Sequence, residues 1–251
     1  MTYSKTLWTL VAGGTLLTTV ACNETRDTGA VTTKTAQGTS TTPPAEVAEK
    51  RDLAMVRVIN ASPSDKSLTI WAGDSVAFAD VGYKKTSDWR ELPDDRFDFQ
   101  IKGAAGGEPL AENREKLQDG GHYTIVALPD MGGADKRNLR VLDDDLKPVP
   151  ADKARIRFIN GLASDTDVDL VISGRKDPLF DGVNFKVEAG WDEIDPVSGT
   201  LIVRPDNGST TLARLADVKL EGGMSYTFVL TGRAGKYDLV KVEDSVARDT
   251  R

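Results

Sequence analysis

The chain carries one cysteine and one histidine in 251 residues, which limits nucleophile–base and metal-binding patterns to very few positions. Cys22 directly follows the apolar stretch 7–21, and Lys5 precedes that stretch. A positive start, an apolar middle and small residues before a cut form the layout of an export signal. The stretch is shorter than the roughly 20 apolar residues of a spanning helix. We therefore expect Cys22 to be covalently modified after export.

Val20-Ala21-Cys22 resembles the lipobox of bacterial lipoproteins, whose cysteine receives a diacylglycerol before cleavage and becomes the first residue. The resemblance implies lipidation at Cys22 and cleavage between Ala21 and Cys22, with 1–21 as signal peptide. Thr19 departs from the pattern, because the family usually has an aliphatic residue there. Thr19 and Ala21 also suit ordinary signal peptidase, which would leave a free thiol on an exported protein. A cytosolic protein with a chance apolar start is the third alternative.

The segment after the cysteine has the composition of a tether. Residues 23–51 hold eight threonines, Pro43-Pro44 and few large apolar side chains, so they cannot offset the entropy of ordering. We expect 22–51 to be disordered. Removing residues 1–21 takes away Lys5 and no acidic residue, which changes the net charge from −7 to −8. Because an acidic body repels phosphate backbones, we expect no nucleic-acid partner.

His122 is the only possible centre of histidine-dependent catalysis, and a histidine-rich metal site is excluded. It follows Gly120-Gly121 at the start of an expected strand, a position typical of a surface or capping histidine. The glycine run 103–107 lacks the spacing and the lysine of a phosphate loop. We therefore expect no catalytic residue and no cofactor.

Two acidic stretches are the candidates for calcium. Residues 165–169 begin like an EF-hand loop, but the sixth position is leucine and the twelfth is lysine, where glycine and glutamate are needed. The alternative is that Asp167 and Asp169 face water while the apolar residues between and after them face the core. Asp143-Asp144-Asp145 is expected to form an acidic turn between domains. We expect no metal site at either place.

A tandem duplication organises the rest of the chain. RVINASPSD at 57–65 returns as RFINGLASD at 157–165, and three later landmarks repeat in the same order. These pair Tyr83, Trp89, Glu91 and Leu92 with Phe185, Trp191, Glu193 and Ile194, residues 99–102 with 201–204, and residues 119–126 with 221–229. A repeat of about 100 residues is a domain rather than a solenoid unit. We predict domains at 52–149 and 150–251, separated by the run Pro148-Val149-Pro150.

Each repeat alternates apolar and polar residues in the manner of β-strands, as at Val56 and Val58. Glu112 to Leu117 is the best helix candidate, and it is short. About seven short strands in 100 residues predict an all-β fold with an immunoglobulin-like sandwich in each repeat. Without a disulfide each domain must rely on packing, so we expect Trp89 and Trp191 in the cores.

The pattern V-R-V-I-N-A-S-P at 56–63, followed by an alternating strand and a Gly-Gly-x-Tyr-Thr strand at 120–124, resembles domain of unknown function 4397. The resemblance implies two tandem immunoglobulin-like copies over about residues 53–245 of an exported or surface-anchored protein, often a lipoprotein. The second copy departs at 161–163, where the Ala-Ser-Pro turn is lost. This bacterial and archaeal family brings no catalytic motif to transfer.

These features predict a non-enzymatic, lipid-anchored cell-envelope protein that acts as a surface binding or adhesion module. Its expected partners are the membrane, through the N-terminal lipid, and an envelope glycan or protein. Asn23 after the cysteine favours the outer membrane in a cell that has one. A structural or assembly lipoprotein of the envelope is the alternative. A carboxylate-dependent hydrolase ranks third, because no spacing singles out an acidic pair.

Overall fold

The computed structural model describes residues 52–233 and 235–244. Throughout these residues every regular element is a β-strand, which confirms the all-β prediction. Within the same ranges, no helix has the length and hydropathy that a membrane span requires. The expected signal peptide, the lipidation site Cys22 and the expected tether lie outside the described residues.

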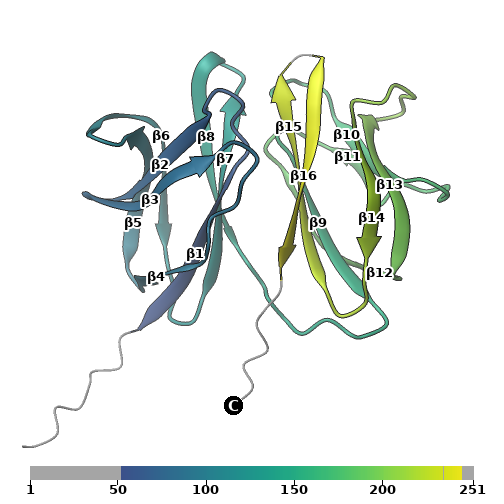
Figure 1. Cartoon of the computed structure of the whole chain (residues 1–251), viewed down its shortest axis with the longest axis horizontal. Helices are drawn as coiled ribbons and strands as arrows, with labels where there is room; N and C mark the ends of the chain where they lie inside the picture. Colours follow the sequence, from purple (N-terminus) through teal and green to yellow (C-terminus); the bar gives the residue numbers. More distant parts are fainter. Residues whose placement is uncertain (1–51, 234, 245–251) are drawn as a thin grey trace, which may run out of the picture. The chain divides into compact units, whose positions relative to one another are not determined.

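The first repeat folds into a sandwich of two four-stranded sheets (Figure 1). One sheet has the order β4-β1-β7-β8 and the other has the order β3-β2-β5-β6. The strands are β1 (Leu53–Asn60), β2 (Ser67–Ala72), β3 (Ser75–Gly82), β4 (Arg90–Pro93), β5 (Arg96–Gly103), β6 (Gly106–Lys116), β7 (His122–Asp130) and β8 (Gly133–Asp143). Strands β1 and β7 run parallel, and the other neighbours pair antiparallel.

The second repeat has the same strand order, which confirms a tandem pair of β-sandwiches. Its sheets are β12-β9-β15-β16 and β11-β10-β13-β14, with β9 and β15 parallel. The strands are β9 (Ala154–Asn160), β10 (Val168–Ile172), β11 (Phe180–Val183), β12 (Glu188–Ile194), β13 (Val197–Pro205), β14 (Ala213–Leu220), β15 (Ser225–Arg233) and β16 (Lys236–Asp244).

The central strands β1 and β7 of the first repeat, and β9 and β15 of the second, are buried on both faces. Along β1, Val56 and Val58 belong to the core of the first sandwich, whereas Ile59 belongs to a cluster formed by both repeats. This shared cluster comprises Ile59, Ala61, Val126, Leu128 and Leu142 of the first repeat and Ile159, Val229, Val240 and Val242 of the second. Burial on both faces accounts for the nearly continuous apolar run of these strands. The two repeats therefore meet through packed side chains.

Gly161 shows how close the packing is at this interface. A Cβ atom at this position would lie 2.3 Å from the Leu230 carbonyl oxygen and 2.9 Å from a methyl group of Leu128 in the first repeat. Both separations are shorter than real Cβ contacts, so only glycine fits without a shift. The second copy thus departs from the Ala-Ser-Pro pattern where it packs against the first repeat.

The short helix candidate at 112–117 is not a helix, and the expectation that the two tryptophans lie in the cores is wrong. Glu112 to Lys116 are the end of strand β6 and pair with β5, because cross-strand pairing outweighs a weak local helix preference. Trp89 and Trp191 are half-buried and belong to neither sandwich core among the described residues. Their rings lie over arginine guanidinium groups instead, an arrangement that the negative face of an indole favours.

Candidate functional site

The asparagine of the repeated RVIN and RFIN motifs anchors loops in both repeats. Asn60 donates from Nδ2 to the Val81 carbonyl at 2.9 Å and accepts from the backbone amide two residues later at 3.0 Å. Asn160 makes the matching bonds, to the Val183 carbonyl at 2.8 Å and from the backbone amide two residues later at 2.9 Å. Both side chains are fully buried. Because buried amides need partners, these bonds fix the turns that follow β1 and β9.

Beside the shared interface, turns from both repeats surround two adjoining hollows. The Phe185 hollow has a volume of 310 Å³ and is lined by Met131, Ser164, Asp165, Asp167, Asn184, Phe185 and Lys186. The Tyr237 hollow has a volume of 400 Å³ and is lined by Pro63, Ser64, Pro129, Asp130, Met131, Leu162, Ala163, Ser164, Gly232, Arg233 and Tyr237. Met131 and Ser164 line both. We refer to the two hollows together as the loop groove.

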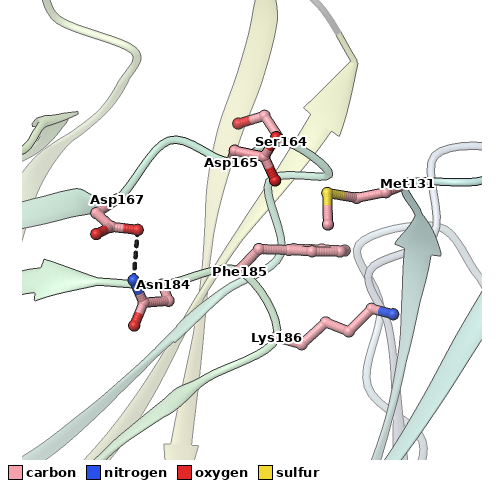
Figure 2. A pocket seen from close by; sticks show the side chains of 7 residues that line it. All are labelled: Met131, Ser164, Asp165, Asp167, Asn184, Phe185 and Lys186. Carbon is pink, nitrogen blue, oxygen red and sulfur yellow. Dashed lines mark hydrogen bonds between the residues drawn. The ribbon is translucent and has the colours of Figure 1, made fainter.

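The apolar surface of the Phe185 hollow is held in place from both repeats. Phe185 and Met131 face each other there (Figure 2), and Met131 is 54% exposed. The next residue, Lys186, has a left-handed backbone φ of 63° and donates its amide to the Asn160 carbonyl at 2.9 Å. Its Nζ atom lies 5.1 Å from the Phe185 ring centroid and donates to Asp130 of the first repeat at 3.1 Å. Lys186 therefore contacts the Phe185 ring and also links this turn to the first repeat.

The rest of the Phe185 hollow is polar. Asp165 is exposed beside Ser164, and Asn184 donates from its amide nitrogen to Asp167 (Figure 2). These side chains offer carboxylate, amide and hydroxyl groups next to the aromatic ring. The hollow therefore combines one apolar surface with several hydrogen-bonding groups.

An ion pair between the repeats balances part of the charge in the groove. The amide of Gly132, followed by the ammonium of Lys186, lowers the pKa of Asp130 below the ordinary aspartate value. Asp130 is therefore ionised at neutral pH and neutralises Lys186. In the Tyr237 hollow, exposed Arg233 donates from Nη2 to Ser64 Oγ at 2.8 Å. The groove thus carries charges of both signs.

His122, the one candidate for histidine-dependent catalysis, lies outside the loop groove. Its half-buried ring makes a T-shaped contact with Trp89, with the ring centroids 5.5 Å apart and the planes at 86°. Cys22 and Ala21 lie outside the described residues, so lipidation and cleavage there stay predictions.

The acidic stretch 165–169 is divided between two environments. Asp165 and Asp167 line the Phe185 hollow, but Asp169 is only 1% exposed, so the expectation that it faces water is wrong. Asp169 accepts from the Gly182 amide at 3.0 Å and from Arg204 Nε at 3.1 Å. These two donors meet the hydrogen-bonding needs of the buried Asp169 carboxylate. The alternation of residues along β10 gives no sign of either donor.

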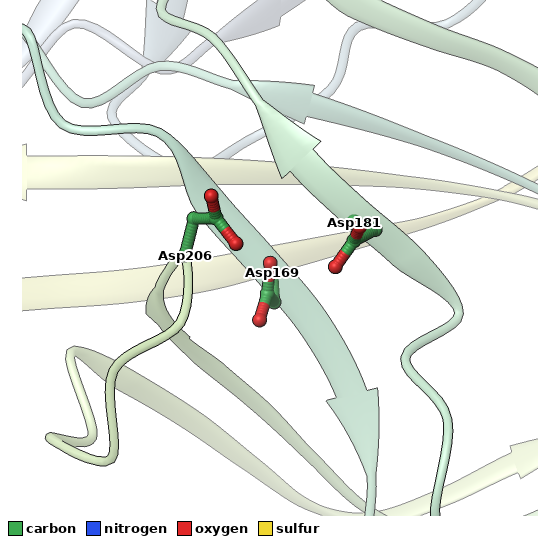
Figure 3. A group of neighbouring side chains, drawn as sticks. All are labelled: Asp169, Asp181 and Asp206. Atoms are coloured by element: carbon green, nitrogen blue, oxygen red, sulfur yellow. The ribbon is translucent and has the colours of Figure 1, made fainter.

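Asp169 also lies near two other carboxylates. Oxygen atoms of Asp169, Asp181 and Asp206 all lie within 4.8 Å of one another (Figure 3). Arg204 already neutralises Asp169 at its buried end, and Asp181 is exposed. Exposed acidic groups are common without a metal, so we assign no metal site to this cluster.

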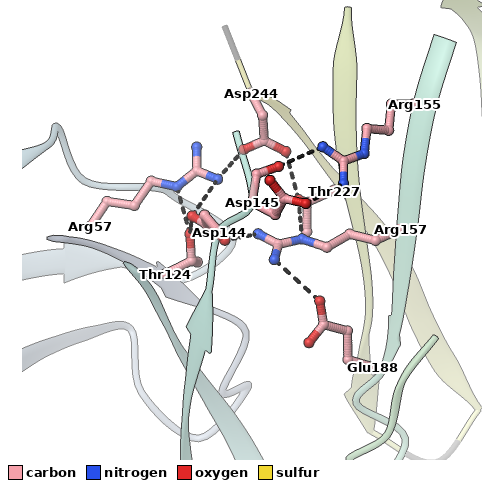
Figure 4. Close-up of polar contacts among 9 residues, drawn as sticks. All are labelled: Arg57, Thr124, Asp144, Asp145, Arg155, Arg157, Glu188, Thr227 and Asp244. Atoms are coloured by element: carbon pink, nitrogen blue, oxygen red, sulfur yellow. Dashed lines mark hydrogen bonds and ion pairs between the residues drawn. The ribbon is translucent and has the colours of Figure 1, made fainter. Parts of the chain in front are cut away.

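A buried charge network joins the two repeats (Figure 4). On the side of the first repeat, Arg57 donates from Nε to Thr124 Oγ1 at 2.9 Å and forms an ion pair with Asp244 of the second repeat. The Nη2 atom of Arg57 also lies 3.7 Å from Asp144, and the Thr124 hydroxyl donates to Asp144. Asp144, expected in an acidic turn, is therefore an interior residue.

The second repeat supplies a matching half of the network. Arg157 donates from Nε to Thr227 Oγ1 at 2.8 Å, and its Nη2 atom lies 2.5 Å from Asp144 of the first repeat. The Thr227 hydroxyl donates to Asp244 at 2.7 Å, and Arg157 also contacts Glu188 at 3.2 Å. Each arginine of the repeated R-x-I-N motif is thus paired with an aspartate from the other repeat.

The network is shielded from water and electrically balanced. The side chains of its two arginines and two aspartates are 0–3% exposed. Trp89 covers Arg57 with 4.5 Å from Cζ to the ring centroid, and Trp191 covers Arg157 at 4.4 Å. Burial raises the pKa of Asp144, while its arginine partners and its threonine donor oppose that effect. The two arginines and two aspartates therefore pair with one another across the junction of the repeats.

The fold and the groove define a protein of two β-sandwich repeats with loops from both gathered at their junction. The family described as Domain of unknown function (DUF4397) matches residues 54–171, which cover the first repeat and the start of the second. The match supports the predicted resemblance for one copy and does not show a second. No curated protein matches the chain.

Several solved structures resemble the chain weakly. The C-terminal domain of AlgF from P. aeruginosa is 28% identical over 37% of this chain and 99% of that domain, with a TM-score of 0.31. A streptococcal virulence factor described as binding α-glucan is 10% identical, covering 74% of this chain and 96% of that one, with a TM-score of 0.23. A family CBM26 module of Eubacterium rectale Amy13K, in complex with maltoheptaose, is 13% identical, covering 78% and 98%, with a TM-score of 0.20. All three scores lie below 0.5, so these likenesses carry no weight for function.

The sequence did not single out the groove itself. Phe185 is visible only as the repeat counterpart of Tyr83, and Met131 belongs to none of the repeated landmarks. The useful signal was the repeated asparagine, because Asn60 and Asn160 mark the turns that reach the groove.

Proposed function

We propose that this protein is a non-enzymatic binding or adhesion module, anchored in the cell envelope by a lipid on Cys22. The loop groove is the observation that carries the proposal. Ligand sites are concave, mix apolar and aromatic surface with a few polar groups, and often lie on loops held by a rigid scaffold. The groove has these properties, and its walls come from turns of both repeats.

The positions of the histidine and of the buried charge network weigh against catalysis in the groove by these particular residues. Arg57, Arg157, Asp144 and Asp244 are engaged with one another at the repeat junction. A general base must lie within hydrogen-bond reach of its substrate. Neither these four residues nor His122 is among the residues that line the groove.

The anchor is tested by replacing the cysteine. Cys22→Ala should prevent lipidation and move the full-length protein from the detergent phase to the aqueous phase in phase partitioning. In a cell with two membranes, we propose that the wild type fractionates with the outer membrane. A wild type that already partitions into the aqueous phase would contradict the anchor.

Binding is tested with the soluble Cys22→Ala chain against isolated envelope polysaccharides and envelope proteins. We expect saturable binding to one of these fractions without turnover. Failure to bind either fraction would contradict the binding module. Capture of a fixed set of envelope proteins without a saturable groove ligand would favour the assembly role, and turnover abolished by one acidic substitution would show a hydrolase.

A further inference from the structure

We propose that the loop groove binds a neutral polysaccharide, with the ring of Phe185 against the apolar face of a sugar. This inference rests on the proposed binding function and names its ligand class. The two hollows adjoin at Met131 and Ser164, and together they are larger than a single-residue pocket. Two adjoining hollows can hold successive units of an extended chain.

The chemistry of the Phe185 hollow matches a sugar unit. A pyranose has one face of C–H groups and a rim of hydroxyls that both donate and accept hydrogen bonds. Phe185 and Met131 supply an apolar surface for the C–H face. Asp165, Asn184 and Ser164 line the same hollow and offer polar groups to the hydroxyls (Figure 2). Hydroxyl donors bind strongly to carboxylates, because such hydrogen bonds are charge-assisted.

The charges of the groove favour a neutral chain over a charged one. Asp165 and Asp167 make the Phe185 hollow acidic, since Lys186 is already paired with Asp130. This arrangement repels the carboxylates of a polyuronate. In the adjoining Tyr237 hollow Arg233 places a positive charge, which repels a polycation. A polyanion and a polycation would therefore each be repelled along part of the groove.

The mixed lining of the Phe185 hollow favours a glycan over a protein. Stable protein partners usually bury about 800 Å² on each side around an apolar centre. In the Phe185 hollow the apolar lining is limited to Phe185 and Met131, with polar side chains on either side. A narrow chain of sugars can fill such a hollow, whereas a flat protein surface cannot.

The test uses the full-length Cys22→Ala chain and isothermal titration with maltoheptaose, cellohexaose and chitohexaose as neutral probes and hexagalacturonic acid as the anionic probe. We expect at least one neutral probe to bind more tightly than the uronate. Phe185→Ala should weaken that binding about tenfold, because an aromatic contact is lost. Trp71→Ala is the matched control, since Trp71 is a half-buried aromatic residue on β2 outside the groove and should leave binding unchanged.

A second variant separates loss of contact from loss of fold. Asn184→Ala removes an amide next to the ring and should weaken binding several-fold, with the unfolding midpoint of each variant measured in parallel. Binding of the uronate alone, or neutral binding insensitive to Phe185→Ala, would overturn the glycan inference and leave the binding module standing. Capture of an envelope protein that Phe185→Ala abolishes, without binding of any probe, would do the same. Absence of both glycan and protein binding would overturn the inference and the proposed function together.

Discussion

Replacing one aspartate should show how strongly the buried charge network holds the two repeats together. Asp144→Asn keeps the shape of the side chain and an oxygen that can accept from Thr124. It removes the negative charge that faces Arg157 at 2.5 Å and Arg57 at 3.7 Å. Arg57 would then keep only Asp244, and Arg157 would keep only Glu188 at 3.2 Å, in a site where the side chains of both arginines are 0–3% exposed.

The expected loss follows from these distances. At an effective dielectric constant of about 20, the two attractions amount to roughly 6–7 and 4–5 kcal/mol. Burying each ion costs several kcal/mol, so the net value of the network is much smaller than these attractions. Removing one partner is different, because it leaves a buried charge uncompensated. We therefore expect Asp144→Asn to lower the free energy of unfolding by about 3–5 kcal/mol.

Urea unfolding followed by tryptophan fluorescence measures this loss, because Trp89 and Trp191 lie against the two arginines. Asp98→Asn is the control: its ion pair with Arg114 is exposed, and the midpoint should hardly move.

A double-mutant cycle with Arg157→Met tests the mechanism. The double variant should be more stable than the sum of the two single losses predicts, since the unpaired cation is removed as well. A loss below about 1 kcal/mol for Asp144→Asn, together with additive losses in the cycle, would refute the reasoning.

Three further predictions concern the histidine, the separate repeats and acid. His122→Ala should leave ligand binding nearly unchanged, because the ring lies outside the groove and the second repeat has no histidine at the matched site. A loss of about 100-fold in a turnover assay, with the fold intact, would contradict a non-enzymatic role. Segments 52–149 and 150–251, expressed separately, should each give a β-type circular dichroism spectrum, since each has its own core, and each should bind a hydrophobic dye through the exposed shared cluster. Two random-coil spectra would mean that neither repeat folds alone. The lowered pKa of Asp130 means that the hydrogen bond from the Gly132 amide and the ion pair with Lys186 stabilise the fold above the ordinary aspartate pKa of about 4, and that this contribution is lost as the pH falls through the lower folded value. The difference in thermal midpoint between wild type and Asp130→Asn should therefore disappear in strong acid, and a difference that persists at pH 2 would contradict this assignment.

The repeated motif shows how far local sequence can lead. In R-x-I-N the alternation predicts a strand, and the structure confirms it in β1 and β9. Alternation also separates Val56 and Val58 on one face from Arg57 and Ile59 on the other. It does not say what covers the second face. An arginine there would normally face water, yet Arg57 is 3% exposed because the other repeat lies against it.

The all-β class and the duplication can be predicted from the sequence alone. These depend on period-two alternation and on landmarks that recur along the chain, both of which are local properties. Three features emerge only in the folded protein: Trp89 and Trp191 cover arginines, Asp144 is buried between the repeats, and Phe185 and Met131 face each other. Each of these depends on contacts between residues far apart in the sequence. Local propensity carries no information about such contacts, because some form only when distant strands of one repeat come together and others only when the two sandwiches pack against each other.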